Sequence, residues 1–316
     1  MNYDMGRKVG DKMKNIIEIK NLCRQFDKFV AVNNISFSVK QGELFAFLGT
    51  NGAGKSTTIS MICTLLPKTS GSIIVDGFDT DKEAAKVRSR LGVVFQTNVL
   101  DDLLTVGDNL NTRARFQGLC GDELHCRINE LRDVFGLSDI WKRPFGKLSG
   151  GQKRKCEIAR AILNKPDILI LDEPTTGLDP QTRTAIWKLI RDMQTQQGMT
   201  VFLTTHYMEE AAAADNVLIL EKGRICAEGT PDTLKSKYGK DTLKLHFPNS
   251  EEGIKQLRAM GYIAKQKADY VLLSIEDSHE ALKIVNSLDD FLDFELIKGN
   301  MDDVFLTVTG HTEVPK

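Results

Sequence analysis

This 316-residue sequence has no long hydrophobic run and almost no net charge, with a formal value of −1. No stretch approaches the roughly 18 consecutive apolar residues that indicate a membrane-spanning helix, and the longest apolar runs, such as 168–171, have the length of a β-strand. The polar N-terminal segment lacks the apolar core of a signal peptide, and Met13 is an alternative start because the regular pattern begins just after it. We therefore expect no direct insertion into a membrane.

The near-zero net charge also bears on binding partners. Proteins that bind nucleic acid nonspecifically need a positive field that attracts phosphates. This sequence has only short basic clusters, such as Lys153–Lys155. We therefore expect no nucleic-acid partner.

The cysteines have no metal-binding or redox spacing. Cys120 and Cys126 lie near His125, but no further ligands follow at the spacing of a zinc site. We expect six reduced, mostly buried thiols in a cytoplasmic protein: Cys23, Cys63, Cys120, Cys126, Cys156 and Cys226.

The order of apolar segments predicts a large α/β domain. Alternating Ile35, Phe37 and Val39 indicate a strand, and the more uniformly apolar segment that follows is typical of a strand covered on both faces. Residues 100–146 have a helical pattern without strong strand candidates. Predicted strands lie at 16–22, within 32–49 on both sides of a turn at Gln41-Gly42, and at 167–173, 199–206 and 216–225. Predicted helices lie at 52–66 (ended by Pro67), 150–165, 182–196 and 208–214. Such alternation is typical of a mostly parallel sheet.

A second, smaller domain is predicted after residue 238. Its segments follow the order strand, helix, strand, strand, helix, strand, which is the ferredoxin-like βαββαβ arrangement. The predicted segments are 242–247, 251–260, 262–266, 270–275, 278–288 and 294–299. We therefore expect domains at 16–238 and 239–310.

The strongest local motif is a glycine-rich loop between a predicted strand and a predicted helix. Its glycines let the backbone fold around phosphate oxygens, and the helix that follows adds its positive end. Lys55 would supply charge to the β- and γ-phosphates, and the Ser56 hydroxyl would ligate Mg²⁺. The alternative is a turn with Lys and Ser by chance. The motif comprises Gly49, Thr50, Asn51, Gly52, Ala53, Gly54, Lys55, Ser56 and Thr57.

Two carboxylates end the apolar strand at 168–171. Parallel sheets bind ligands at the carboxyl ends of their strands, so Asp172 is predicted to lie beside Ser56 and to help hold Mg²⁺. Glu173 is predicted to polarise an attacking water as general base. The alternative, a strand that simply ends in a polar turn, would be preferred without the glycine-rich loop.

A third motif, Leu148-Ser149-Gly150-Gly151-Gln152, resembles the LSGGQ sequence of ABC ATPases. A serine hydroxyl, glycine N–H groups and a helix N-terminus form an anion site. The resemblance implies a head-to-tail dimer in which Ser149, Gly150, Gly151 and Gln152 contact the ATP of the other protomer.

Further matches follow in the family's order over about residues 16–235. Gln96 resembles the Q-loop glutamine that contacts Mg²⁺ or water, and His206 resembles the H-loop histidine near the γ-phosphate. Asp179 lies in a segment similar to the D-loop. Phe26 stands where the family stacks an aromatic ring, commonly tyrosine, on adenine, and Phe95 replaces a frequent proline. Each match is weak alone, and their order carries the resemblance.

The resemblance implies an ABC ATPase domain at 16–238, with a helical subdomain at about 98–160, and a C-terminal accessory domain at 239–310. It further implies ATP and Mg²⁺ as ligands, a second ATPase subunit, and a separate transmembrane permease that residues 99–121 would contact from the cytoplasmic side. The accessory domain and the segments 221–239 and 301–310 resemble the drug and antibiotic (daunorubicin-resistance-type) exporter branch. The alternatives are a soluble ABC ATPase acting on ribosomes or DNA, and an import motor.

Overall fold

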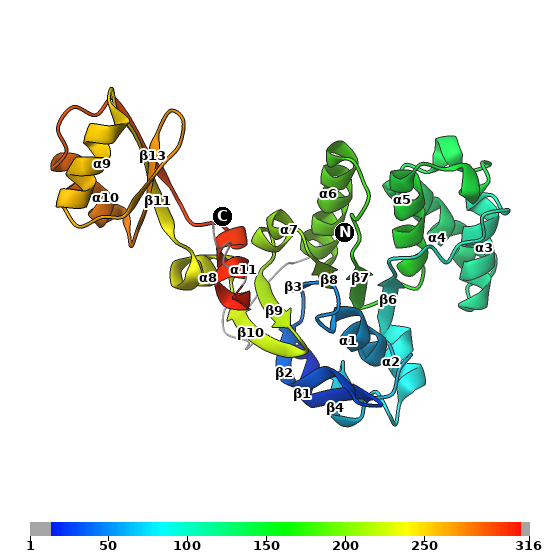
Figure 1. Ribbon diagram of the computed structural model, residues 1–316. Coiled ribbons are helices and arrows are strands. Elements are labelled where there is room, and N and C mark those ends of the chain that lie inside the picture. Colours follow the sequence, from blue (N-terminus) through cyan, green and yellow to red (C-terminus); the bar gives the residue numbers. More distant parts are fainter. Residues whose placement is uncertain (1–13, 311–316) are drawn as a thin grey trace, which may run out of the picture.

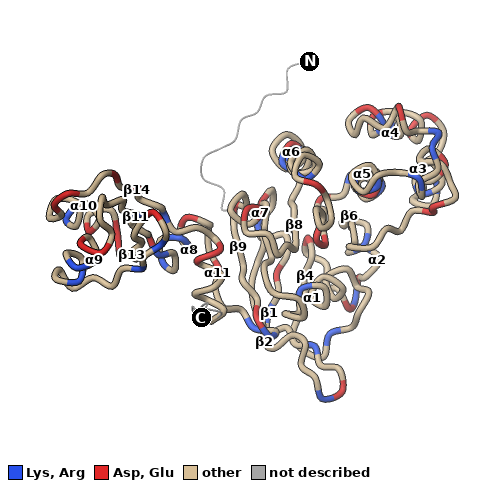
Figure 2. The backbone as a smooth tube through the Cα atoms, turned by 45° about the horizontal axis from the view of Figure 1, so that its top comes forward, with Lys and Arg blue, Asp and Glu red and all other residues tan. Residues whose placement is uncertain are grey.

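The computed structural model describes residues 14–310. Met13 and the polar segment before it lie outside these residues. Among residues 14–310, no helix is both long enough and apolar enough to cross a bilayer. Figure 1 shows a mixed α/β body with helices α3, α4 and α5 on one side and a small domain on the other. Basic and acidic residues are interspersed along the chain (Figure 2).

A six-stranded sheet forms the centre of the large domain, in the order β10-β9-β3-β8-β7-β6. Only the pairing of β10 with β9 is antiparallel, so the sheet is mostly parallel, as predicted. The strands are β3 (Leu44–Gly49), β6 (Leu91–Val94), β7 (Ile168–Asp172), β8 (Thr200–Thr205), β9 (Asn216–Glu221) and β10 (Arg224–Gly229).

A second, antiparallel sheet covers one face of this central sheet, a separate layer that the sequence pattern did not predict. Its order is β2-β1-β4-β5. Phe37 of this layer stacks on Phe45 and Phe47 of β3, with ring centroids 5.6 and 5.5 Å apart. Because strands such as β3 are covered on both faces, they are apolar at every position. The strands are β1 (Asn15–Phe26), β2 (Phe29–Lys40), β4 (Ser70–Val75) and β5 (Phe78–Asp79).

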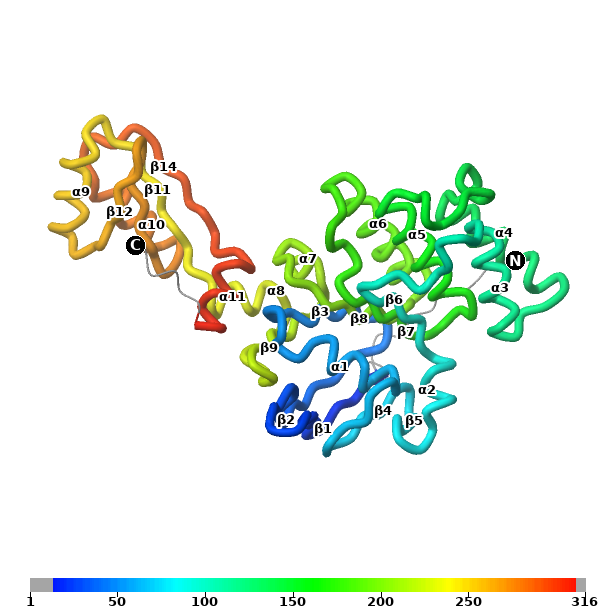
Figure 3. The backbone as a smooth tube through the Cα atoms, turned by 45° about the vertical axis from the view of Figure 1, so that its right-hand side comes forward, coloured from blue at the N-terminus to red at the C-terminus, as the bar shows by residue number. Residues whose placement is uncertain are grey.

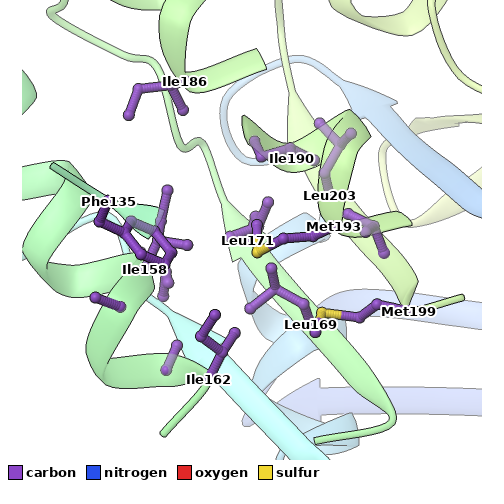
Figure 4. Close-up of a cluster of buried hydrophobic side chains, with 14 of the residues drawn as sticks. Phe135, Ile158, Ile162, Leu169, Leu171, Ile186, Ile190, Met193, Met199 and Leu203 are labelled. Atoms are coloured by element: carbon purple, nitrogen blue, oxygen red, sulfur yellow. The ribbon is translucent and has the colours of Figure 1, made fainter. Parts of the chain in front are cut away.

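Helices pack on the other face, except α1 and α2, whose buried residues belong to the core of the antiparallel layer. Ile158 and Ile162 from the α5 region and Ile186 and Ile190 of α6 surround Leu171 of β7 (Figure 4). The helices of the large domain are α1 (Lys55–Ile62), α2 (Ala84–Arg90), α3 (Val106–Phe116), α4 (Gly121–Val134), α5 (Gly150–Ala161), α6 (Pro180–Gln197), α7 (Met208–Ala212) and α8 (Pro231–Tyr238), with short 3₁₀ turns at Ser138–Ile140 and Phe145–Lys147.

Two local predictions are wrong. The first helix ends at Ile62, well before Pro67, because Thr64 adopts a left-handed φ of 59° that cannot continue a helix. The cysteines are not mostly buried: only Cys63 and Cys156 are, whereas Cys120, Cys126 and Cys226 are exposed.

The small domain has its own sheet and core. Its order, β12-β13-β11-β14, and its fully antiparallel pairing match the predicted βαββαβ arrangement. Helices α9 and α10 share one hydrophobic core with a single face of this sheet, and Figure 3 shows this small domain beside the large one. The elements are β11 (Asp241–His246), α9 (Ser250–Ala259), β12 (Ala264–Gln266), β13 (Val271–Ile275), α10 (Ser278–Asn286) and β14 (Asp293–Ile297).

One further helix, α11 (Met301–Thr309), returns to the large domain. Met301 and Val304 are buried in the large hydrophobic core rather than in the core of the small domain. The chain enters and leaves the small domain where Gly239 and Gly299 meet: a Cβ atom on Gly299 would lie 2.9 Å from the Gly239 Cα. The small domain is thus joined to the large one by two adjacent chain segments, around Gly239 and Gly299, which together form the neck.

Candidate functional site

The glycine-rich loop (residues 49–57, the phosphate loop) joins β3 to α1. At two positions of this loop, any side chain would clash with a backbone carbonyl group. A Cβ atom on Gly49 would lie 2.5 Å from the carbonyl oxygen of Leu220, and one on Gly54 would lie 2.6 Å from that of Ala31. Gly54 also has a φ of 109°, a conformation that favours glycine. The backbone N–H groups at the start of α1 lie at the end of this loop, where they can bind an anion.

Lys55 lies inside the phosphate loop. Its Nζ donates to the carbonyl oxygens of Gly49 at 2.7 Å and Thr50 at 3.2 Å. The side chain is 5% exposed, and this burial lowers the pKa of Lys55, while nearby Glu173 and Asp172 raise it. The loop thus holds a positive charge close to two carboxylates.

The Glu173 carboxylate is the centre of the site. Its Oε1 lies 3.7 Å from the Lys55 Nζ. Its Oε2 lies 3.4 Å from the Gln96 Nε2, 3.6 Å from the His206 Nδ1 and 3.2 Å from the Thr176 hydroxyl. Side chains that are far apart in the sequence therefore meet at one carboxylate beyond the end of β7.

Thr204, at the end of β8, orients the two acidic residues. Its hydroxyl donates to the Asp172 Oδ1 at 2.6 Å and accepts from the Glu173 N–H at 3.0 Å. Asp172 is 7% exposed, so a shielded carboxylate is fixed near the phosphate loop. No motif in the sequence indicates this role of Thr204.

Glu173 also has an unusual backbone conformation. Its φ is 47°, in the left-handed region that non-glycine residues rarely adopt. Such a residue costs about 1–3 kcal/mol and persists only where its surroundings hold it.

Arg154 and Glu210 were not predicted as site residues either. Arg154 was grouped with Lys153 and Lys155 as a basic cluster, but its side chain is buried and donates to the backbone carbonyls of Phe95 and Glu173. Glu210 is buried and accepts from the hydroxyls of Thr175 and Thr205. Their partners are 5 to 59 residues away, so no local motif identifies them.

The LSGGQ segment does not join the cluster around Glu173. Ser149 caps α5: its hydroxyl accepts from the Gln152 N–H at 3.3 Å, and its own N–H donates to the Gln152 side chain. A Cβ atom on Gly151 would lie 2.2 Å from the Thr182 Cγ2 at the start of α6. Asp179 caps α6 by accepting from the Thr182 N–H at 2.9 Å. These residues form a separate pair of helix N-termini.

The remaining predicted residues belong to β1 or to the phosphate loop itself. Phe26 ends β1, is 40% exposed, and carries the Arg24 guanidinium 4.3 Å from its ring centroid. The following strand, β2, approaches Gly54 through Ala31. Ala53 is buried, Thr57 is half-buried, and Asn51, Gly52 and Ser56 are exposed. Thr50 donates to Glu221 at 2.8 Å.

Known proteins resemble this chain in sequence and in fold. A family model described as ABC transporter matches residues 32–176. The daunorubicin/doxorubicin resistance ATP-binding protein DrrA of Streptomyces peucetius is 37% identical over 306 residues, which cover 93% of this chain and 92% of that protein. The linearmycin resistance ATP-binding protein LnrL of Bacillus subtilis is 36% identical over 311 residues, 94% of this chain and 99% of that protein.

A solved structure shares the fold. It is a dimeric ATP-binding cassette in a post-hydrolysis state bound to ADP and Pi, with a TM-score of 0.62 and 29% identity over 68% of this chain and 98% of that one. The predicted family and fold class are therefore confirmed. This chain belongs to the ABC transporter ATP-binding proteins and is an ATP-binding, ATP-hydrolysing transporter subunit.

Proposed function

We propose that this subunit binds ATP with Mg²⁺ at its phosphate loop, hydrolyses it in a head-to-tail dimer, and so powers export through a separate membrane permease. The observation that carries the proposal is the convergence of Lys55, Gln96 and His206 on the Glu173 carboxylate. Positive charge for a phosphate and a base for a water molecule are thereby placed in one site.

The donor groups suit Mg²⁺, which prefers oxygen ligands. We assign it to the Ser56 hydroxyl, the Asp172 carboxylate and the Gln96 amide oxygen. Ser56 is exposed at the start of α1, whereas Asp172 is shielded and oriented by Thr204. Bound there, the ion would neutralise charge on the phosphates.

The chain's own residues then have distinct roles. The N–H groups of residues 49–57 and the Lys55 ammonium bind phosphate oxygens, and Phe26 stacks on adenine. Glu173 accepts a proton from water. The side chains of His206 and Gln96 keep the Glu173 carboxylate and the water aligned. Both side chains have a nitrogen within 3.6 Å of the Glu173 Oε2.

A second copy of the chain completes the site. Ser149, Gly150, Gly151 and Gln152 form a helix N-terminus suited to an anion, yet they are separate from the phosphate loop of their own chain. We therefore assign them, with Asp179, to the ATP of the partner. The dimer described for the solved relative supports this assignment.

The export role rests on the relatives and on two exposed apolar side chains. DrrA and LnrL are named as drug-resistance ATP-binding proteins. Leu103 and Phe116, in the segment that we assign to the permease contact, are 88% and 81% exposed. We place the subunit on the cytoplasmic face of the membrane, and propose that 16–238 is the ATPase domain, with a helical subdomain at about 98–160, and that 239–310 is the accessory domain. The relatives do not favour a ribosomal or DNA role.

The test is the variant Glu173→Gln, which keeps the size of the side chain but removes the base. We expect ATP turnover to fall by at least about 100-fold while ATP still binds, so that a closed dimer accumulates in size-exclusion chromatography with Mg-ATP. The double variant Glu173→Gln with Ser149→Arg is the control: it should bind ATP but remain monomeric. Normal turnover in Glu173→Gln would refute the base assignment, and dimers of the double variant would refute the assignment of Ser149 to the partner's ATP.

A further inference from the structure

The backbone of Glu173 is held at both of its polar groups. Its N–H donates to the carbonyl oxygen of Thr204 at 3.2 Å and to the Thr204 hydroxyl at 3.0 Å. Its carbonyl oxygen accepts from the Arg154 Nη2 at 2.9 Å. A left-handed φ of 47° persists only under such constraint. Thr204 belongs to the neighbouring strand, whereas Arg154 comes from a different part of the domain.

Arg154 binds a second backbone group beside the site. Its Nη1 donates at 2.7 Å to the carbonyl oxygen of Phe95, the residue before Gln96. The side chain is 6% exposed. A planar guanidinium can hold two acceptors at fixed angles, which the single ammonium of lysine cannot. One side chain therefore fixes the backbone next to two of the groups assigned to catalysis.

The same helix, α5, also binds the rest of the segment around Gln96 (residues 93–100, the Gln96 loop, which includes the end of β6). The buried carboxylate of Glu157 accepts from the N–H groups of Val99 at 2.7 Å and Leu100 at 3.0 Å. Arg160 donates to the carbonyl oxygen of Val93 and pairs with Glu157 at 3.0 Å. Arg154, Glu157 and Arg160 are three residues apart, so they line one side of α5. The loop is bound to α5 both before and after Gln96.

We propose that Arg154 is a positioning residue for ATP hydrolysis. It holds the strained backbone of Glu173 and the backbone before Gln96, and so sets both side chains relative to the bound nucleotide. Arg154 also stands five positions after Ser149, the N-cap of α5. It therefore connects the backbone of Glu173 and of the residue before Gln96 to the helix that we assign to the partner's ATP. The inference rests on the proposed role of Glu173 as general base.

The test compares Arg154→Met with Arg127→Met, a matched control. Arg127 is also a buried arginine that donates to two backbone carbonyls, those of Leu163 and Ile162, but near the C-terminal end of α5. We expect kcat of Arg154→Met to fall at least about tenfold, about 1.4 kcal/mol of activation free energy, with the Kd for ATP changed less than about threefold. Arg127→Met should lower the unfolding temperature but keep kcat within about threefold.

Two further measurements separate positioning from a general loss of structure. Millimolar guanidinium, at a concentration that leaves the wild type unaffected, should restore part of kcat in Arg154→Ala. Arg154→Lys, which can still reach one carbonyl, should have an intermediate kcat and serves if the other variants fail to fold. Wild-type kcat in Arg154→Lys and Arg154→Met, or equal loss in Arg127→Met, would overturn the proposal.

Glu173→Gln is measured in the same assay to separate the two ideas. If Glu173→Gln is inactive while the Arg154 variants turn over normally, only the positioning role fails. If Glu173→Gln itself turns over normally, the proposed base fails, and with it the reason for holding its backbone.

Discussion

At the scale of single residues, Glu43 shows how a buried carboxylate makes stability depend on pH. Its side chain is 8% exposed in the turn before β3, and its Oε2 accepts from the Lys40 N–H at 2.7 Å. Burial raises the pKa of Glu43, and the nearby Asp215 charge adds to this effect, while the Lys40 hydrogen bond and charge oppose it. The native state therefore binds this proton more tightly than the unfolded chain.

Replacing Glu43 by Gln should reveal this linkage. Because the native pKa lies above the ordinary 4.5, the contribution of Glu43 to stability is full below that pH and is lost as the pH rises through the native pKa. The free energy of unfolding of Glu43→Gln, relative to the wild type, should therefore increase from pH 4 to neutral pH. Denaturant unfolding at several pH values measures this difference. The exposed Glu252→Gln is the control, and equal pH dependence in both variants would contradict the interpretation.

At the scale of elements, α7 connects the segments after β7 and β8. Glu210 of α7 is 3% exposed and accepts from the Thr175 hydroxyl, two residues after Glu173, and from the Thr205 hydroxyl, one residue before His206. The Thr205 hydroxyl in turn accepts from the Tyr207 N–H at 3.0 Å. One buried carboxylate thus links the loops that carry the proposed base and the proposed histidine.

Glu210→Ala should be strongly destabilising. It leaves two buried hydroxyls without their acceptor and creates a cavity, so we expect a loss of about 2–4 kcal/mol in the free energy of unfolding. ATP turnover should fall as well, because both loops lose their common anchor. The neighbouring Glu209→Ala, an exposed position, is the control and should change stability by less than about 0.5 kcal/mol. Denaturant unfolding and steady-state ATPase assays measure both effects, and similar results for the two variants would show that the link is unimportant.

At the scale of the whole molecule, α11 decides how the small domain is attached. The chain leaves the large domain after α8, builds the βαββαβ unit, and returns through Gly299 to α11, which packs beside α8 and α7. Lys298 and Gly299 both donate to the carboxylate of Asp241, at 2.6 and 3.1 Å, and so hold the two segments of the neck together. The boundary near residue 238 stays a prediction, but α11 contributes to the core of the large domain.

Val304→Asp should detach α11. Val304 is fully buried, and an unpaired carboxylate there would cost several kcal/mol if α11 stayed docked. We expect a lower unfolding temperature and rapid proteolytic cleavage near Gly239 and Gly299. The exposed Thr307→Asp adds the same charge one turn further along α11 and should behave like the wild type. Equal protease resistance of the two variants would show that α11 does not hold the neck.

The sequence by itself was enough to predict those parts of the site whose residues are adjacent in the chain. Phosphate binding depends on consecutive backbone N–H groups, so the phosphate loop can be read from residues 49–57, and the carboxylates follow their strand directly at Asp172 and Glu173. The βαββαβ order was equally visible, because strand and helix patterns have different periods.

Only the tertiary structure decided which distant groups meet. In the sequence, Arg154 is part of a short basic cluster. In the structure, α5 places its side chain against the backbone of Phe95 and Glu173, which are 59 and 19 residues away. The separate antiparallel layer and the return of α11 also escaped prediction, because strand pairing and helix docking depend on which apolar faces are left to cover. A hydrophobic pattern shows that a face will be buried, but the packing of the whole chain determines what buries it.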